Sequence, residues 1–345
     1  MFLEERRKLV DEIDRKIIEL IIERNKLTEE IIEYKKNNNL DIIDVERENE
    51  IINKLKDKYC EKIKIEQIEK IYSEILFFSK YNYISNNLNS ELNQIFSSKP
   101  LLIAGPCSIE SEEQIFRIAK DLSEMGIKYL RGGAFKPRTS PDTFQGLGEQ
   151  GLIYIYKAAS KYGMNVVTEI TSREQFVEYS ELVDIIQIGS RNMFSYQFLK
   201  DIGELNSKIN KPIILKRHFA ATLNEFLNAA EYLKKSGSEN IILCLRGIRT
   251  FEQIDSKMRN TPDLASILEL KNRTDLPVIF DPSHSTGKSE FVISISKAAL
   301  ALGTDGLIIE THFDPKNSIV DSEQTIDYFQ LKIILSFIEQ IKYAK

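Results

Sequence analysis

The chain has 345 residues, of which 42% are hydrophobic and 29% charged, and its formal net charge is −5. This composition is ordinary for a globular protein, and the length suggests more than one domain. The acidic balance argues against a nucleic-acid partner, and no apolar run approaches the roughly 18 residues that a membrane span needs. Three scattered cysteines are too few for a disulfide framework, so we expect free thiols and a cytoplasmic protein.

The first part of the chain is helical in pattern. Residues 3–38 repeat apolar side chains at helical spacing without Gly or Pro, which predicts one long amphipathic helix. Similar patterns at 45–58 and 65–83 predict two more, so residues 1–85 are expected to form an all-α domain of three helices. At 1.5 Å per residue the first helix is roughly 50 Å long and overhangs such a unit. We therefore expect an intertwined homodimer, or a homotetramer built from it.

A polar, Asn- and Ser-rich stretch, residues 86–99, is expected to be a linker. Beyond it, over residues 100–345, short apolar runs alternate with amphipathic helical patterns. The expected strands are 101–105, 128–134, 165–170, 185–190, 212–217, 241–247, 277–283 and 306–312. Eight strands alternating with helices over this length predict a TIM (β/α)8 barrel, with a doubly wound open sheet as the alternative. The expected fold class is therefore α/β, a barrel preceded by an all-α domain.

Charged or metal-capable residues follow the expected strands. Active sites of TIM barrels lie at the carboxyl ends of the strands, and folding alone requires no such residues there. The charged or metal-capable residues that follow the expected strands are Cys107, Arg131, Lys136, Arg138, Glu169, Arg191, Lys216, Arg217, Arg246, His284 and Glu310. The cations suit phosphate or carboxylate ligands, whereas a mixed sulfur, nitrogen and oxygen set suits a divalent transition metal. That set is Cys107, His284, Glu310 and Asp321. Any one of these residues could instead be a solvated loop charge.

The motifs of this half resemble those of a known enzyme family. They are GPCSIES (105–111), LRGGAFKPRTSP (130–141), FQGLGEQGL (144–152), IGSRNM (188–193), LKR (215–217), RGIRTFE (246–252), DPSHSTG (281–287) and IIETH (308–312). Over residues 101–330 the chain is similar to the type I 3-deoxy-D-arabino-heptulosonate-7-phosphate (DAHP) synthases, nearest the β subgroup. The resemblance implies condensation of phosphoenolpyruvate with D-erythrose 4-phosphate and water to give DAHP and phosphate, the first step of the shikimate pathway.

The resemblance also implies roles for individual residues. The implied metal ligands are Cys107, His284, Glu310 and Asp321. Phosphoenolpyruvate is expected to bind Arg131, Lys136, Arg191, Lys216 and Arg246, and the phosphate of erythrose 4-phosphate to bind Arg138, Thr139 and Ser140. The expected cofactor is a divalent metal ion, Mn2+ first, with Fe2+, Co2+ or Zn2+ as alternatives. We expect Lys136 to deliver a proton to the developing alkoxide, and His284 to shape the metal site.

The helical half resembles the helical chorismate mutases over residues 3–83. The matching stretches are LEERRKLVDEIDRKIIELIIERNKLTEEIIEYKK and DIIDVERENEI. The resemblance implies that chorismate or prephenate is contacted by Arg7, Arg24, Lys35, Asp44, Arg47, Glu48 and Ser79, with Arg7 reaching the site of a second copy of the chain. Conversion of chorismate to prephenate needs positioning and charge complementarity rather than a nucleophile. Binding of either compound to regulate the barrel is the alternative role.

Three positions depart from the patterns of these families. Tyr83 stands where the mutases have Gln or Glu, His218 stands where the synthases commonly have Gly, and Leu245 stands where they commonly have an acidic residue. The alternative interpretation of the whole chain is a 3-deoxy-octulosonate-8-phosphate synthase barrel with a non-catalytic helical dimerisation module. The KPRTSP motif and the mutase-like helices favour the four-carbon sugar.

Overall fold

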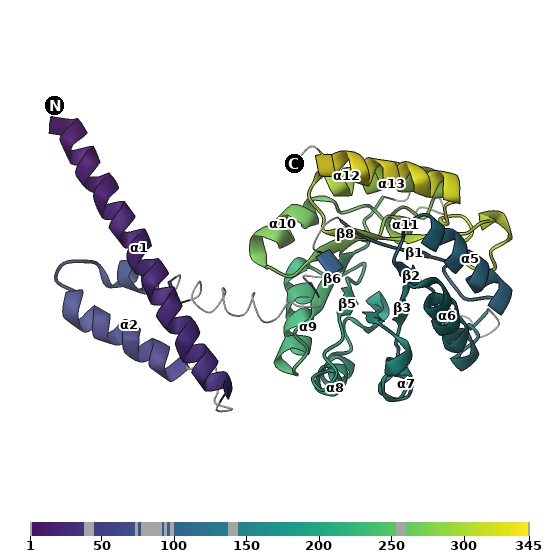
Figure 1. Cartoon of the computed structure of the whole chain (residues 1–345), viewed down its shortest axis with the longest axis horizontal. Coiled ribbons are helices and arrows are strands. Elements are labelled where there is room, and N and C mark those ends of the chain that lie inside the picture. Colours follow the sequence, from purple (N-terminus) through teal and green to yellow (C-terminus); the bar gives the residue numbers. More distant parts are fainter. Residues whose placement is uncertain are drawn as a thin grey trace. The chain divides into compact units, whose positions relative to one another are not determined.

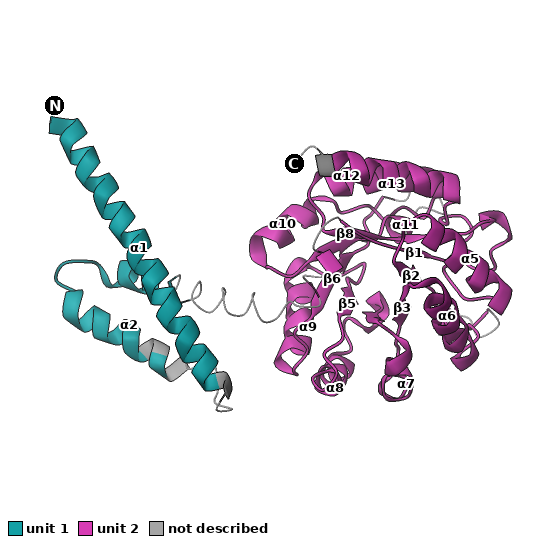
Figure 2. Cartoon of the chain, viewed as in Figure 1, with its two compact units in different colours: residues 1–90 teal, residues 91–345 magenta. Residues whose placement is uncertain are grey.

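The computed structural model describes residues 2–37, 45–72, 75–76, 92, 95–96, 100–136, 144–252 and 260–343 (Figure 1). The chain divides into two compact units, residues 1–90 and residues 91–345 (Figure 2). Among the described residues, no helix is both long enough and apolar enough to cross a membrane.

The first unit is helical, as predicted. It contains α1 (Phe2–Asn37) and α2 (Val45–Tyr59), and helical residues resume over 65–72. Ile32 and Ile68 are buried. Many apolar side chains of α1 are nevertheless exposed: Phe2, Leu3, Leu9, Val10, Ile13, Ile17, Ile18, Leu20, Ile22, Leu27 and Ile31. A helix of this length needs partners for its apolar face, and one copy of the chain covers only part of it. The intertwined dimer that would cover the rest stays a prediction.

The second unit is a closed barrel of eight parallel strands in sequence order, with β8 pairing back to β1. The strands are β1 (Leu101–Gly105), β2 (Tyr129–Arg131), β3 (Asn165–Glu169), β4 (Ile185–Ile188), β5 (Ile213–Lys216), β6 (Ile241–Leu245), β7 (Val278–Phe280) and β8 (Gly306–Glu310). Each lies inside a predicted strand. Their near-continuous apolar runs suit strands that are buried on both faces. The TIM barrel is confirmed, and the open sheet is excluded by the closing pair.

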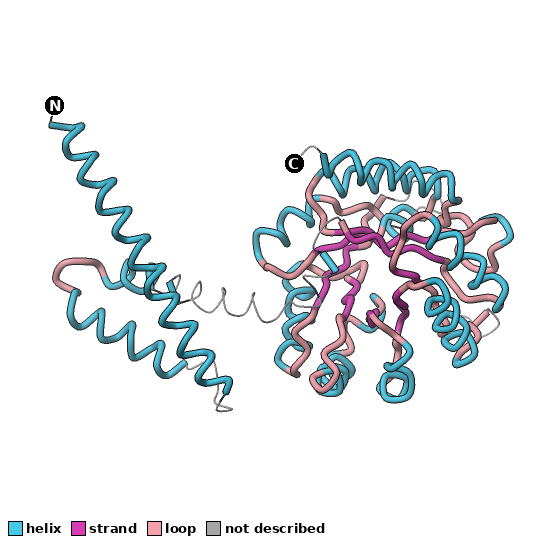
Figure 3. Tube along the Cα trace, viewed as in Figure 1, coloured by secondary structure: helices cyan, strands magenta, loops and turns pink. Residues whose placement is uncertain are grey.

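Helices surround the strands in an outer layer (Figure 3). They are α5 (Glu112–Glu124), α6 (Glu149–Tyr162), α7 (Arg173–Tyr179), α8 (Tyr196–Asn206), α9 (Leu223–Lys235), α10 (Ala265–Arg273), α12 (Ser289–Ala301) and α13 (Tyr328–Tyr343). The short helix α11 (Pro282–Thr286) is mostly buried and directly follows the end of β7. Local capping fixes where several of the helices begin. Ser111 accepts a hydrogen bond from Gln114 N, and Thr222 and Glu225 form a capping box. The two caps therefore begin α5 and α9 six or seven residues after the ends of β1 and β5, close to the strand ends that carry the candidate site.

The barrel interior is filled by a second apolar cluster, distinct from the one between strands and helices. Its strand residues are Leu101, Ile103, Val167, Ile185, Ile214, Ile242, Cys244, Ile279 and Ile308. Leu92 is buried in the same cluster, and Ile95 and Phe96 pack against it. These three residues lie within the stretch 86–99 that we expected to be a linker. That part of the stretch belongs to the barrel unit, because its few apolar side chains pack against the barrel interior.

Candidate active site

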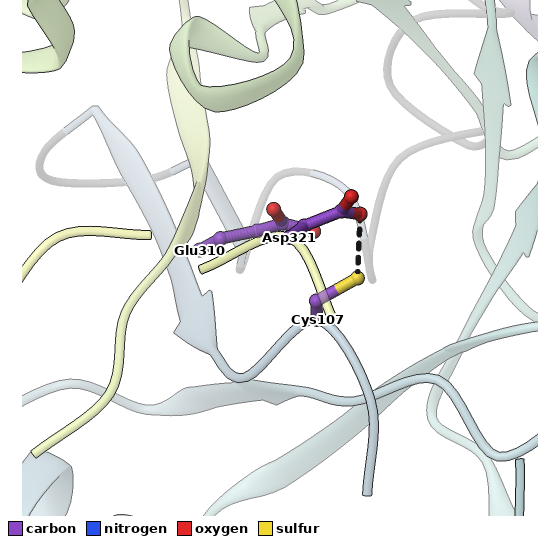
Figure 4. A group of neighbouring side chains, drawn as sticks. All are labelled: Cys107, Glu310 and Asp321. Atoms are coloured by element: carbon purple, nitrogen blue, oxygen red, sulfur yellow. Dashed lines mark hydrogen bonds between the residues drawn. The ribbon is translucent and has the colours of Figure 1, made fainter. Parts of the chain in front are cut away.

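Cys107, Glu310 and Asp321 meet at the carboxyl end of the barrel (Figure 4). Cys107 follows β1, Glu310 ends β8, and Asp321 lies in the loop between β8 and α13. One donor atom from each lies within 4.8 Å of the others, and Cys107 Sγ is 3.0 Å from Asp321 Oδ2. Ligand atoms that share a metal at 2.0–2.3 Å are themselves about 3–4 Å apart when adjacent. The three residues therefore fit a divalent transition metal in spacing and in donor chemistry.

Both carboxylate oxygens of Glu310 are engaged. Arg131 Nη1 donates to Oε1 at 3.0 Å, and Gln324 Nε2 donates to Oε2 at 2.6 Å. Burial by itself would raise the pKa of Glu310, but its electrostatic interactions with His284, Arg131 and Lys136 lower it overall. Glu310 is thus an ionised, fixed carboxylate, which is the form that binds a metal.

The Cys107 thiol is buried and lies beside an ammonium group. Lys136 Nζ donates to Sγ at 3.1 Å. Burial raises the pKa of Cys107 well above its usual value, and Glu310 raises it further, while Lys136 lowers it. Gly133 permits this approach, since a Cβ there would come within 2.5 Å of Lys136 Cε and 2.9 Å of Cys107 O. The contact of Sγ with Asp321 Oδ2 at 3.0 Å fits a thiol that donates, whereas a metal would be bound by the thiolate.

His284 is held by Asp281, the N-cap residue of α11. Asp281 Oδ1 accepts from His284 N at 2.8 Å, and Asp281 Oδ2 lies 2.8 Å from His284 Nδ1. The other ring nitrogen, Nε2, is 3.4 Å from Glu310 Oε1. Burial would raise the pKa of Asp281, yet His284 and Lys216 lower it well below its usual value. The structure thus places His284 beside Glu310, although the group of three does not include it.

The predicted anion-binding cations fall into three positions. Arg131 and Lys216 are buried in ion pairs, with Glu310 and Asp281 respectively. Arg246 follows β6 and connects the segments after β4 and β7, because its Nη1 donates to Ser190 Oγ at 3.2 Å and its Nη2 to His284 O at 3.2 Å. Arg191 is exposed in the short 3-10 helix Ser190–Asn192. Arg138, Thr139 and Ser140 lie outside the described residues.

The two residues that depart from the synthase pattern, His218 and Leu245, differ in burial. His218 is half-buried between the rings of Phe194 and Phe219, at centroid distances of 5.0 and 4.1 Å. Burial lowers the pKa of His218, and the charges of Arg246 and Arg249 lower it further. It is therefore a neutral imidazole at the mouth of the barrel. Leu245 is buried in the cluster between strands and helices, so an apolar residue suits that position.

The residues predicted to bind chorismate or prephenate lie in the helical unit. Arg7 is exposed, Arg24 and Lys35 are half-buried, and Arg47 Nη1 pairs with Glu50 Oε2 at 2.5 Å. Asp44, Ser79 and Tyr83 lie outside the described residues, as does the side chain of Glu48. Arg7, Arg24 and Lys35 lie on α1 and Arg47 on α2, so the predicted mutase residues come from both of these helices.

Four residues near the site had no predicted role: Glu110, Ser190, Asp281 and Gln324. Asp281 had a readable signal, because it precedes His284 by three residues at the start of a short helix, the position of a capping residue. Gln324 had none, since nothing in the sequence links it to Glu310.

A closed barrel whose strand ends carry buried cations beside a cysteine and two acids defines a class of protein. It is a TIM-barrel enzyme for anionic substrates, with a group of three residues that could hold a divalent metal. The chain belongs to the DAHP synthetase I family, whose model matches residues 93–344, and residues 6–81 match chorismate mutase type II. The predicted resemblance to both families is confirmed. Members of the barrel family generally use a divalent metal.

Individual proteins that are similar to this chain belong to the same family of barrel enzymes or to a related one. The phospho-2-dehydro-3-deoxyheptonate aldolase of Thermotoga maritima is 41% identical over 295 residues, 84% of this chain and 85% of that protein. A crystal structure of this DAHP synthase superposes with a TM-score of 0.66 at 46% identity, over 70% of this chain and 69% of that one. The 2-dehydro-3-deoxyphosphooctonate aldolase of Francisella philomiragia is more distant, at 30% identity over 72% of this chain and 94% of that protein.

Proposed function

We propose that the barrel condenses phosphoenolpyruvate with D-erythrose 4-phosphate and water, releasing DAHP and phosphate. The main support for this proposal is the group of Cys107, Glu310 and Asp321 inside a barrel of this family. Two cations contact the group, Arg131 at Glu310 and Lys136 at Cys107. Relatives that act on the eight-carbon product are matched more weakly, which supports the four-carbon aldehyde as substrate.

The reaction joins two anions, so charge must be compensated. C3 of phosphoenolpyruvate attacks the aldehyde carbon, water adds at C2, and phosphate leaves with cleavage of its C–O bond. Arg131, Arg191, Lys216 and Arg246 are proposed to hold the phosphate and carboxylate of phosphoenolpyruvate through charge-assisted hydrogen bonds. We assign the phosphate of the aldehyde substrate to Arg138, Thr139 and Ser140.

The proposed metal is Mn2+, with Fe2+, Co2+ or Zn2+ as alternatives, held by Cys107, Glu310 and Asp321 with His284 beside them. When bound, it supplies Lewis-acid polarisation of the aldehyde carbonyl. Lys136 is proposed to give a proton to the developing alkoxide, since its ammonium lies next to the metal group at Cys107 Sγ. The Asp281 carboxylate lies against the Nδ1 side of the His284 ring, and Nε2 faces Glu310.

The helical unit is proposed to convert chorismate to prephenate, or to bind them as feedback regulators of the barrel. Arg7 and Lys35 stand about 42 Å apart along α1 at 1.5 Å per residue, so one chain cannot bring both to one small ligand. A second copy that covers the exposed apolar face of α1 would supply the missing arginine, which supports the homodimer. Ligand binding to one quaternary arrangement would then bias the synthase.

We propose the division into a mutase-like domain at 1–85, a connection at 86–99 and the barrel at 100–345, with Leu92 already packed in the barrel. A cytoplasmic location is part of the proposal, since a thiol that binds a metal must stay reduced.

Consumption of phosphoenolpyruvate by the metal-stripped chain tests the barrel proposal. Turnover with erythrose 4-phosphate that appears only after Mn2+ is added, and is not supported by arabinose 5-phosphate, is the expected result. Preference for arabinose 5-phosphate would instead favour the octulosonate reaction. Adding chorismate to the same chain, and to Arg24→Ala, tests the helical unit, because loss of chorismate should require Arg24.

A further inference from the structure

The loop that carries Asp321 is held by side chains to which the proposed reaction gives no role. This loop, residues 311–327, joins β8 to α13. Its base is closed by the backbone, because Ile326 N donates to Glu310 O at 3.0 Å and His312 N donates to Ile326 O at 3.1 Å. These bonds fix the two ends of the loop beside β8, but they do not fix its middle, where Asp321 lies.

Asp321 has an unfavourable backbone conformation. Within the described ranges, Asn210 and Asp321 alone among non-glycine residues have a positive φ, and that of Asp321 is +54°. This conformation costs a residue with a side chain on the order of 1 kcal/mol, and it persists where surrounding contacts hold it. The Asp321 carbonyl accepts from Gln324 N at 3.3 Å and from Thr325 N at 3.2 Å, which closes the turn after it. Contacts before Asp321 must hold the other side.

Glu110 supplies those contacts. Its Oε1 accepts from Ile319 N at 2.8 Å and lies 3.2 Å from Ser318 Oγ, whose one proton is shared with Val320 O at 3.0 Å; Ile319 and Ser318 stand two and three residues before Asp321. Glu110 itself lies three residues after Cys107, and its own N–H donates to Gln114 Oε1 at 3.0 Å in the first turn of α5. One carboxylate oxygen thus ties the segment that carries Asp321 to the segment that carries Cys107.

Gln324 acts on the third member of the group. Its side chain is 3% exposed and donates to Glu310 Oε2 at 2.6 Å. It lies three residues after Asp321, within the turn that the Asp321 carbonyl closes. The position of the loop therefore determines both where Asp321 stands and how Glu310 is oriented.

We propose that Glu110 is a positioning residue that latches residues 318–324 onto the loop after β1, holding Asp321 beside Cys107 and Gln324 against Glu310. The inference rests on the proposed metal site and adds to it the device that assembles the ligands. Releasing the latch separates the carboxylate of Asp321 from the thiol while the barrel stays closed, because Glu110 lies outside the apolar clusters.

Two variants of Glu110 separate hydrogen bonding from charge. Glu110→Ala removes the acceptor, whereas Glu110→Gln keeps an oxygen that accepts from Ile319 N and Ser318 Oγ. Glu113→Ala is the matched control, since it removes an exposed carboxylate three residues along the chain. If Glu110→Ala does not fold by circular dichroism, Ser318→Ala removes one of the two contacts from the other side.

Two readouts are used on the full-length, metal-stripped chain. The first is the dissociation constant of Mn2+, followed by electron paramagnetic resonance of the free ion. We expect affinity to fall about tenfold or more in Glu110→Ala, as for residues that orient metal ligands. The second is the alkylation rate of Cys107 in the absence of metal, followed by peptide mass spectrometry with exposed Cys60 and buried Cys244 as internal references. We expect it to rise about tenfold in Glu110→Ala, because the covering loop opens more often.

In Glu110→Gln the Mn2+ dissociation constant and the Cys107 alkylation rate should both stay within about threefold of the wild-type values, because a neutral acceptor retains most of a hydrogen bond's net free energy. If Glu110→Ala and the wild-type chain have the same Mn2+ affinity and the same Cys107 alkylation rate, the proposed latch is wrong. An equal loss in Glu110→Gln or in Glu113→Ala also contradicts it, because either would show a charge effect. If the unchanged chain binds no Mn2+, the proposed metal site fails, and the Cys107 alkylation rates still decide the latch by themselves.

Discussion

Asp281→Asn is the substitution that most directly tests how the buried charges of the barrel depend on one another. Asp281 is 0% exposed, and its carboxylate meets Lys216, which is 4% exposed, and Nδ1 of His284. Asparagine keeps the size of the side chain and caps a helix about as well as aspartate, so α11 should still begin at the same place. The change therefore removes the charge and little else.

Two consequences of known size follow. Removing one partner of a buried ion pair costs about 3–5 kcal/mol, because the remaining charge stays desolvated. With a urea m-value of about 3 kcal/mol/M, the unfolding midpoint of the barrel should fall by at least about 1 M. An amide also removes the negative charge that lies 2.8 Å from Nδ1 of His284, so metal affinity should fall about 10- to 100-fold if Asp281 orients this ring.

Urea unfolding followed by near-UV circular dichroism, together with Mn2+ titration of the stripped chain, measures both effects. Asp275→Asn is the control, since it makes the same chemical change at an exposed position six residues earlier. A stability loss under about 1 kcal/mol in Asp281→Asn, with metal affinity within about threefold, would refute the reasoning, because Lys216 would then have no need of its partner.

Three further predictions concern single side chains of the barrel. Cys107→Ser should weaken Mn2+ binding by at least about 100-fold in a direct titration, since a hydroxyl is a far poorer ligand than a thiolate. Lys136→Met should lower kcat by about 10²- to 10⁴-fold at saturating metal, the usual size of a lost proton transfer, while exposed Lys128→Met leaves kcat unchanged. Burial raises the pKa of Cys244 to about 12, so this thiol stays neutral in the folded barrel while the unfolded chain ionises above about pH 9. The folded-to-unfolded equilibrium constant is measured by urea titration for the wild-type chain and for Cys244→Val. The wild-type constant divided by that of the variant should fall by roughly tenfold per pH unit above about pH 9 and stay level below it. If this quotient stays constant up to about pH 10.5, the prediction is contradicted.

Sequence pattern was sufficient for the barrel because burial on both faces makes each strand a short continuous apolar run. β6 (Ile241–Leu245) and β8 (Gly306–Glu310) lie inside the predicted 241–247 and 306–312, each shortened by two residues at its carboxyl end. Those trimmed residues carry site chemistry or lead into loops, so they leave the strand ladder. Leu92 was harder to place, since Leu88, Leu92, Ile95 and Phe96 repeat at helical spacing over only nine residues, within a stretch that is otherwise polar.

The candidate site could be predicted only in part. Cys107 and Glu310 follow from their places at strand ends, and the structure brings them together. Asp321 lies eleven residues beyond β8 in an irregular loop, so only the family resemblance pointed to it. The contacts of Glu110 with Ser318 and Ile319 span more than 200 residues, and no local pattern encodes such pairs. The roles of these residues as ligands and positioning groups stay predictions until they are measured.

Buried charge in this barrel comes in opposite-sign pairs, and that arrangement explains how the site exists before a substrate arrives. Arg131 lies with Glu310 and Lys216 with Asp281, and none of the four is more than 6% exposed. An unpaired charge at such depth would cost several kcal/mol, so the acids allow the fold to keep cations at its strand ends. The same acids also contact His284, which stands beside the candidate metal group. The cations for phosphate and the ligands for the metal are therefore coupled through shared carboxylates, and a change at Asp281 should reach both.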